Sequence, residues 1–217
     1  MRGSSLKRKN INWKDYKHCC LNLLHKRSFL INAIIGGLFY LPTSIFAVLW
    51  GVSFLRMQDS LPATQASLAI TLLFLGWAIG SPIIGFFCGH FKFKRIVLIG
   101  AATLAMLLSI CLLYTHQIAD MVYFILFTLG LLSSFQVIVW DRLAASTETD
   151  NTGIAIALTN MIIMIIPVFF HLIVGALMDL HHTMIHEKLK HFYSLADYHF
   201  ALIVIPLAFF SVVILQL

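Results

Sequence analysis

Five polar side chains lie inside long apolar stretches of this sequence and are its best candidates for binding a solute: Tyr40, Ser44, Gln136, Asn160 and His171. Tyr40 and Ser44 are four residues apart, and Asn160 and His171 are eleven apart, so the members of each pair lie on one side of a helix. Polar groups in hydrocarbon are costly and usually face the interior of a helix bundle. The pattern therefore predicts polar stripes around a shared water-filled cavity. The alternative is that these groups only hydrogen-bond one helix to another.

His171 is the ionisable side chain that lies deepest in any apolar stretch, whereas Asp120, Asp141 and Asp179 fall near the ends of such stretches. Because histidine titrates near neutral pH, His171 is a candidate for relaying a proton that drives transport. The competing interpretation is a neutral histidine that is satisfied by a neighbouring helix. A coupling proton is the one cofactor that the sequence suggests.

Four further histidines lie close together in sequence, and the pair His182 and His186 has the i, i+4 spacing that lets two side chains on a helix share a metal ion. Thr183 follows His182, so the metalloprotease signature HExxH is absent, and no cysteine joins the group. A solvated polar loop without a metal is therefore expected for these residues, which are His181, His182, His186 and His191. The sequence has no nucleophile motif and no phosphate-binding glycine loop, so we do not expect an enzyme.

Six apolar stretches carry these polar residues, and each is long enough to cross a bilayer. Hydrophobic residues make up 60% of the 217 residues, charged residues make up 11%, and the mean hydropathy is +0.91. These values predict an all-α integral membrane protein whose partner is the lipid bilayer. The predicted spans are about 29–55, 63–88, 95–114, 119–140, 154–178 and 198–217.

Twelve of the fifteen basic residues fall in segments that would share one side of the membrane. The positive-inside rule then predicts that both termini are cytoplasmic. Residues 1–28 form a basic segment in which 11–27 are expected to be an interfacial helix, with a solvated basic lead-in as the alternative. The net charge of +6 is a topology signal, and nucleic-acid binding is not expected because no aromatic-interleaved basic face accompanies it.

Two ladders of small residues at four-residue steps lie in the second span: Gly76 with Gly80, and Ser81 with Gly85 and Gly89. Such ladders remove side-chain bulk along one strip of a helix. A neighbouring helix can then approach the backbone closely. The sequence therefore predicts close helix packing against this span.

Three sequence segments resemble helices of the C-terminal half of a transporter of the major facilitator superfamily (MFS). Phe39-Tyr40-Leu41-Pro42, followed by Trp50-Gly51, resembles the seventh helix of twelve. The run from Gly76 through Pro82 and Gly85 to Lys94-Arg95 is similar to the eighth helix and the signature cytoplasmic loop. The run from Asn160-Met161 to Val174 and Asp179 resembles the eleventh helix. The resemblance covers nearly the whole chain and implies that Gly85, Lys94 and Arg95 are gating-loop residues.

The sequence departs from the family pattern at two places. In the signature loop, Gly89 stands where an aspartate is expected, and Lys92 stands where the second glycine is expected. In the eleventh helix, His171-Leu172 stands where a Gln-Pro pair is common. The first departure removes the charge contact that the aspartate would make, so gating by this loop is in doubt.

The resemblance implies one bundle of two inverted three-helix repeats and transport by alternating access. The chain would be half or a fragment of a secondary transporter for a small solute in a bacterial plasma membrane, and His171 suggests a proton symporter. A second six-helix half or a second copy of the chain would complete the binding site. The alternative function is a non-transporting six-span protein, either an orphan half or an interaction subunit.

Overall fold

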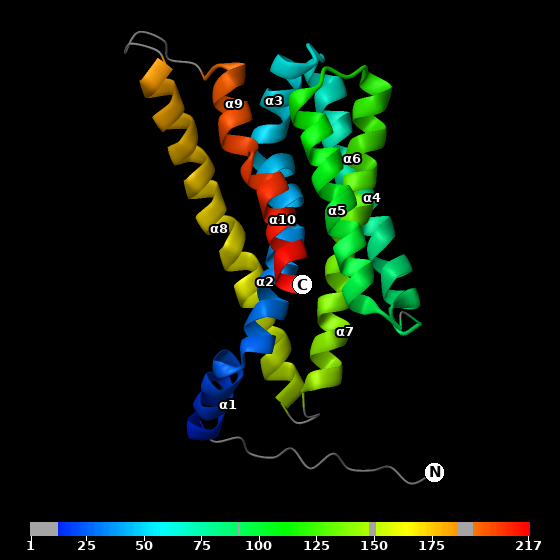
Figure 1. Ribbon diagram of the computed structural model, residues 1–217, viewed down its shortest axis with the longest axis vertical. Coiled ribbons are helices and arrows are strands. Elements are labelled where there is room, and N and C mark those ends of the chain that lie inside the picture. Colours follow the sequence, from blue (N-terminus) through cyan, green and yellow to red (C-terminus); the bar gives the residue numbers. More distant parts are fainter. Residues whose placement is uncertain (1–12, 91, 148–150, 186–192) are drawn as a thin grey trace.

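The computed structural model describes residues 13–90, 92–147, 151–185 and 193–217, and this part of the chain is helical and contains no strand. Figure 1 shows a bundle of long helices, with α1 beneath it at the end where the chain enters α2. In chain order the helices are α1 (Trp13–His25), α2 (Arg27–Leu41), η1 (Pro42–Trp50), α3 (Gly51–Gln58), α4 (Ala63–Cys88), α5 (Lys94–Tyr114), α6 (Ala119–Ser133), η2 (Ser134–Gln136), α7 (Val137–Ser146), α8 (Thr152–Ile185), α9 (Leu195–Leu202) and α10 (Val204–Gln216).

Six helical stretches are long and apolar enough to cross a membrane, as the sequence predicts: Arg27–Gln58, Ala63–Cys88, Lys94–Tyr114, Ala119–Ser146, Thr152–Met184 and Leu195–Gln216. The second and third agree closely with the predicted bounds. The fourth and fifth continue about two turns further than predicted. Hydropathy marks the thickness of the hydrocarbon, whereas helical hydrogen bonds continue into the polar interface.

Three of the spans change their helical geometry part-way along. The first contains the π-helix η1, which begins at Pro42, and in it the N–H of Gly51 bonds to the carbonyl of Phe46 five residues earlier. A Cβ at Gly51 would lie 2.5 Å from that carbonyl oxygen, so the wide turn requires glycine there. The fourth contains the tight 3₁₀ turn η2. The sixth breaks at Ile203, three residues before Pro206, which has no N–H to continue the ladder.

The main helix pairs of the bundle are α4 with α6, α5 with α10, and α2 with α8. Further contacts join α2 to α10 and α5 to α6. In Figure 1, α2 and α10 lie between α8 on one side and α4, α5 and α6 on the other. One large apolar core joins the spans, and a second, smaller core of Leu23, Phe29, Leu143, Ile154 and Ala155 lies where α1 meets α2, α7 and α8.

The predicted close packing of the glycine ladders is confirmed for the first ladder only. A Cβ at Gly76 would overlap the carbonyl oxygen of Phe127 on α6, and a Cβ at Gly130 would overlap that of Leu73 on α4. Gly80 meets the side chain of Ser134 in the same crossing. In the second ladder, Gly85 has only ordinary contact with Val137, and Gly89 has no atom of another helix within 4 Å. That strip of α4 is therefore not a packing surface within the bundle.

Apart from Arg56 in the last turn of α3, the described basic residues gather at one end of the bundle, as the charge pattern predicts. This end, here called the basic end, contains the start of α2, the α4–α5 and α7–α8 connections and the end of α10. Basic residues described there are Lys17, Lys26, Arg27, Lys92, Lys94, Arg95 and Arg142. The opposite end, here called the histidine end, contains the end of α8 and the start of α9. Residues 1–12, which hold more of the predicted basic segment, lie outside the described residues.

Candidate functional site

Two of the five predicted cavity residues are in direct contact. The hydroxyl of Ser44, in η1, and Nε2 of His171, in α8, are 3.1 Å apart and share a hydrogen bond between the first and fifth spans. Ser44 is buried and His171 is half-buried. The second ring nitrogen of His171, Nδ1, is buried and has no hydrogen-bond partner among the described residues. One side of this imidazole thus joins two helices, while the other is unsatisfied.

The remaining three cavity candidates do not join this pair. Tyr40 is half-buried, and its ring lies 6.1 Å from the ring of Trp77 on α4, centroid to centroid. Gln136 is buried in η2, and its Oε1 has no partner in the described chain. Asn160 is exposed on α8, although it lies three turns before His171. A single continuous polar stripe on α8 therefore does not face the bundle interior.

Several other buried polar atoms of the spans have no hydrogen-bond partner in the described chain: Oδ1 of Asn32, Nε1 of Trp50, Nε1 of Trp77, Oγ of Ser133 and Oγ1 of Thr159. An unpaired polar group in an apolar medium costs free energy comparable to a lost hydrogen bond, or more. Native structures satisfy such groups with protein, water or ligand. The interior of this bundle thus has more hydrogen-bonding capacity than its own residues use.

The gating-loop candidates contact other helices at the basic end. Lys94 forms an ion pair with Asp141 on α7, and Arg95 donates to the main-chain carbonyls of Gln216 and Leu217 at the end of α10. Gly85 makes no close contact, as described above. Asp141, the partner of Lys94, thus comes from a helix that does not flank the α4–α5 connection.

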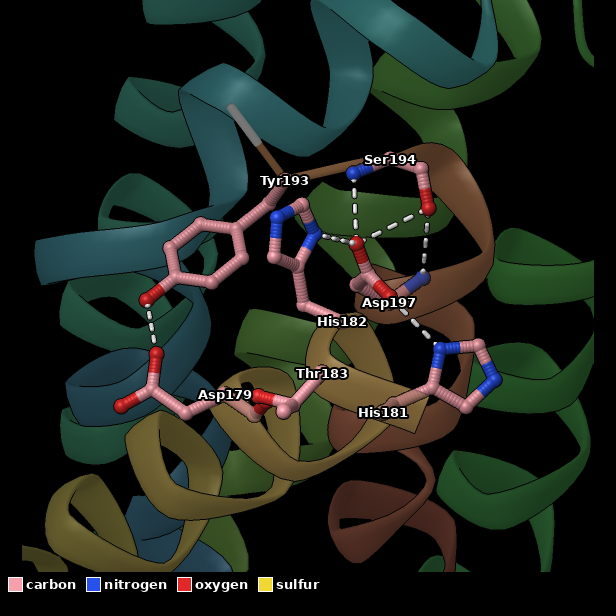
Figure 2. A network of polar contacts seen from close by, with 7 residues as sticks. All are labelled: Asp179, His181, His182, Thr183, Tyr193, Ser194 and Asp197. Carbon is pink, nitrogen blue, oxygen red and sulfur yellow. Dashed lines mark hydrogen bonds and ion pairs between the residues drawn. The ribbon is translucent and has the colours of Figure 1, made fainter. Parts of the chain in front are cut away.

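A second polar network surrounds Asp197 at the histidine end (Figure 2). Nδ1 of His181 lies 2.6 Å from Oδ1 of Asp197, and Nδ1 of His182 lies 3.1 Å from Oδ2. The main-chain N–H and the hydroxyl of Ser194 also donate to Oδ2, at 2.7 and 2.9 Å. The Asp197 side chain is fully buried. These contacts attach the end of α8 to the start of α9.

The expectation of a solvated loop is wrong for His181 and His182. Both histidines belong to α8, which runs beyond the predicted span, and both are half-buried against the Asp197 carboxylate. His186 and His191 lie outside the described residues. Among the residues that the structure describes, no three His, Cys, Asp or Glu side chains are arranged to hold a metal ion.

Tyr193 connects this network to Asp179. Its hydroxyl donates to Oδ1 of Asp179 at 2.5 Å, and its ring contacts those of His182 and Trp50 edge-on. The bond to the Asp179 carboxylate, helped by burial, raises the pKa of the Tyr193 phenol to about 12. Deprotonation would place two negative charges side by side, so the phenol keeps its proton.

A sequence signal for part of this network exists. Ser194 and Asp197 form a capping box at the start of α9, in which Ser194 Oγ accepts from the N–H of Asp197 and the Asp197 carboxylate accepts from the N–H of Ser194. The spacing S-x-x-D before an apolar run is typical of this motif, although glutamate or glutamine is more common at the last position. The pairing of Asp197 with His181 and His182 has no comparable local signal.

Comparison with known proteins found no family model that matches the chain and no curated protein that is similar to it in sequence.

Proposed function

We propose that this chain is half of a secondary transporter of the MFS type, or a fragment of one, that moves a small solute by alternating access. The pairing of the helices supports this arrangement. Spans one to three are represented by α2, α4 and α5, and spans four to six by α6, α8 and α10. If the two sets are exchanged in that order, the pair α2–α8 becomes α6–α4, and the pair α2–α10 becomes α6–α5. The α5–α10 pair exchanges with itself. This is the pattern that two inverted three-helix repeats would produce.

The hydrogen bond between Ser44 and His171 is the observation that carries the proposal. It joins the first and fifth spans through a histidine, the residue type whose charge can change at physiological pH. In the neutral ring, the tautomer decides whether Nε2 accepts from the Ser44 hydroxyl or donates to it. Protonation of His171 would make both ring nitrogens donors, so Nε2 could only donate, and Nδ1 would carry an N–H without a partner among the described residues. Such a change alters how strongly η1 holds α8, which is a route by which a proton can drive a rocking motion.

A complete site would need a second six-helix half or a second copy of the chain. Exposed polar residues such as Asn160, and half-buried ones such as Tyr40 and His171, are suited to such a cavity because they are within reach of a partner bundle. The basic end would face the cytoplasm of a bacterial cell under the positive-inside rule. In that orientation, Lys94 and Arg95 hold the cytoplasmic ends of three helices together.

Reconstitution into proteoliposomes tests this proposal. The purified chain, alone and together with a second six-helix half, is assayed for uptake of labelled dipeptides, amino acids and sugars. The fluorescence of pyranine enclosed in the vesicles reports proton entry. We expect solute uptake that accelerates with an inward proton gradient. H171Q is expected to abolish the response to the gradient, while H90Q, a matched change at an exposed histidine of the α4–α5 connection, is expected to keep it.

An unchanged pH dependence in H171Q would overturn the role of His171. The absence of uptake in every preparation would favour the alternative, a non-transporting interaction subunit. The exposed apolar surface of α8, in which only 22% of the most apolar window is buried, favours that alternative because it can pack against another helical protein. Retained membrane insertion without uptake would then be expected.

A further inference from the structure

A crevice at the basic end lies where α1 meets α2 and α7. A cavity of about 370 Å³ is lined there by Lys26, Ser28 and Phe29 from the start of α2, by Arg142 and Ser146 from α7, and by Gln216 from α10, among others. A second cavity of about 680 Å³ shares Leu23, Lys26, Ser146 and Thr147 with it and adds His18 and His25 from α1. The two cavities therefore form one continuous crevice that reaches under α1.

The polar side of this crevice is cationic. Lys26 and Arg142 line it, and none of the described lining residues is acidic. Both terminal nitrogens of Arg142 donate to the neutral Oε1 of Gln216 at 3.1 Å. Within the described chain, the Lys26 ammonium has no ion-pair partner, whereas the nearby Lys94 is neutralised by Asp141. The crevice therefore favours an anion.

The start of α2 adds to this preference. Lys26 precedes the helix and provides no side-chain cap, and the first turn contains no acidic residue. The free N–H groups and the positive end of the helix dipole are thus available beside the lysine. Hydroxyl groups of Ser28 and Ser146 are further donors on the crevice wall.

The other side of the crevice is apolar. Leu23, Phe29 and Leu143 are buried residues of the smaller core, and the half-buried Ile31 extends the same wall along α2. Ile35, one turn further on, is fully buried and closes the inner end of the crevice. A free inorganic anion would gain nothing from this wall. An amphiphile would place its charge near Lys26 and Arg142 and the start of its hydrocarbon beside Ile31.

The geometry points to a binding site for an acidic phospholipid, with its phosphate at Lys26 and Arg142 and the start of an acyl chain beside Ile31. α1 lies at the junction with the first span, where an amphipathic helix would lie in the membrane interface. The site beside it is therefore at the depth of the lipid headgroups. The bound lipid would fix the angle between α1 and the bundle. This role does not depend on whether the chain transports a solute.

Thermal unfolding and native mass spectrometry of the purified chain in detergent test the site. The probes are dioleoyl phosphatidylglycerol, dioleoyl phosphatidylcholine and inorganic phosphate. We expect phosphatidylglycerol to raise the melting temperature and to remain bound at one copy per chain. Phosphatidylcholine and millimolar phosphate are expected to do neither. Protection by phosphate equal to that by phosphatidylglycerol would overturn the lipid assignment.

Charge-neutral variants locate the binding. Each basic residue near a headgroup is worth about 1 kcal/mol, so K26Q is expected to weaken phosphatidylglycerol binding about fivefold, and K26Q/R142Q about 30-fold. The matched control K17Q/K92Q removes two exposed charges of the same end that do not line the crevice, and it is expected to bind as the unaltered chain does. Because the Lys26 side chain makes no hydrogen bond or ion pair with the described residues, K26Q alone remains informative if the double variant is unstable.

Two outcomes of the variants would overturn the site. Equal losses in K26Q/R142Q and K17Q/K92Q would mean that lipid binds by diffuse charge attraction.

Glu148 and Asp150 lie outside the described residues, close in sequence to the crevice lining. Neutralising them in E148Q/D150N is expected to leave the preference for phosphatidylglycerol in place, and loss of that preference would also overturn the site.

Discussion

Two of the main helix crossings, which the proposed inverted repeats would make equivalent, are built differently. At the α4–α6 crossing, Gly76 and Gly130 each face a main-chain carbonyl of the opposite helix, so backbone packs directly on backbone. At the α2–α8 crossing, Gly36 and Gly37 face the side chains of Ile163 and Ile166. The nearest atom to a Cβ at Gly36 would be Cδ1 of Ile163, at 2.8 Å.

The difference indicates where the bundle can yield. Backbone atoms cannot move without moving the helix, so α4 and α6 form a rigid pair. An isoleucine tip can change rotamer at a cost of order 1 kcal/mol, so α8 can shift on α2. Polar contacts along α8 add to its attachment, among them Ser44 to His171 and Asp197 to His181 and His182.

The largest effect is expected for G130A, at the rigid crossing. The added methyl group overlaps the carbonyl oxygen of Leu73, so α4 and α6 must separate along their length. We expect a loss of about 3 kcal/mol in the free energy of unfolding, measured by denaturant titration in mild detergent. The control is G175A on α8, where no atom lies within 4 Å, and it should be neutral or slightly stabilising. Equal effects in the two variants would remove the distinction between the crossings.

A smaller effect is expected for G36A, at the adjustable crossing. Its methyl group meets the flexible end of Ile163, and we expect a loss of about 1 kcal/mol. Removing Cδ1 in the double variant G36A/I163V should recover most of that loss, measured against I163V alone in a double-mutant cycle. A loss as large as that of G130A, without recovery, would show that the α2–α8 crossing is equally rigid.

The smallest effect concerns the contact of Tyr193 with Asp179 on α8. Because the fold raises the phenol pKa from 10.0 to about 12, the protonated form is favoured in the folded chain. The contribution of this bond to stability is fully present below pH 10 and is lost as the pH rises through 12. The difference in absorbance at 295 nm between the unaltered chain and Y193F measures ionisation of the Tyr193 phenol, and its midpoint should therefore lie near pH 12. In D179N the phenol should titrate at a lower pH than in the unaltered chain, because the carboxylate that favours the protonated phenol is gone. A midpoint near 10 in the unaltered chain would contradict the bond.

The sequence predicts the spans and the glycine crossing well, because both depend on local patterns. Twenty apolar residues must become a helix in hydrocarbon, and Gly76 with Gly80 must leave a strip without side chains. The sequence could not predict that Ser81, Gly85 and Gly89 would remain unpacked, because the packed and the unpacked ladder have the same four-residue spacing. The π-turn after Pro42 was also missed, because proline marks a disturbance without specifying how the helix accommodates it.

The candidate site was predicted in part. Sequence periodicity selects Ser44 and His171 separately, and the structure joins them across the bundle. The same periodicity predicts an inward Asn160, which is instead exposed. Eleven residues give three turns only in an ideal helix. The direction in which the Asn160 face of α8 points also depends on how α8 packs on α2 and α9. His181 and His182 were assigned to a loop because their distant partner, Asp197, cannot be inferred from local sequence.

The sequence by itself determined that the chain is helical, that it has six spans, and that its basic residues share one end. Those properties follow from hydrocarbon length, backbone hydrogen bonding and charge, which act on each segment separately. Tertiary structure alone decided which helices pack, which glycines meet backbone, and which carboxylate each cation or histidine faces. Those outcomes depend on residues that are far apart in the sequence, such as Ser44 and His171 at a separation of 127 positions, whose meeting is set by the packing of whole helices.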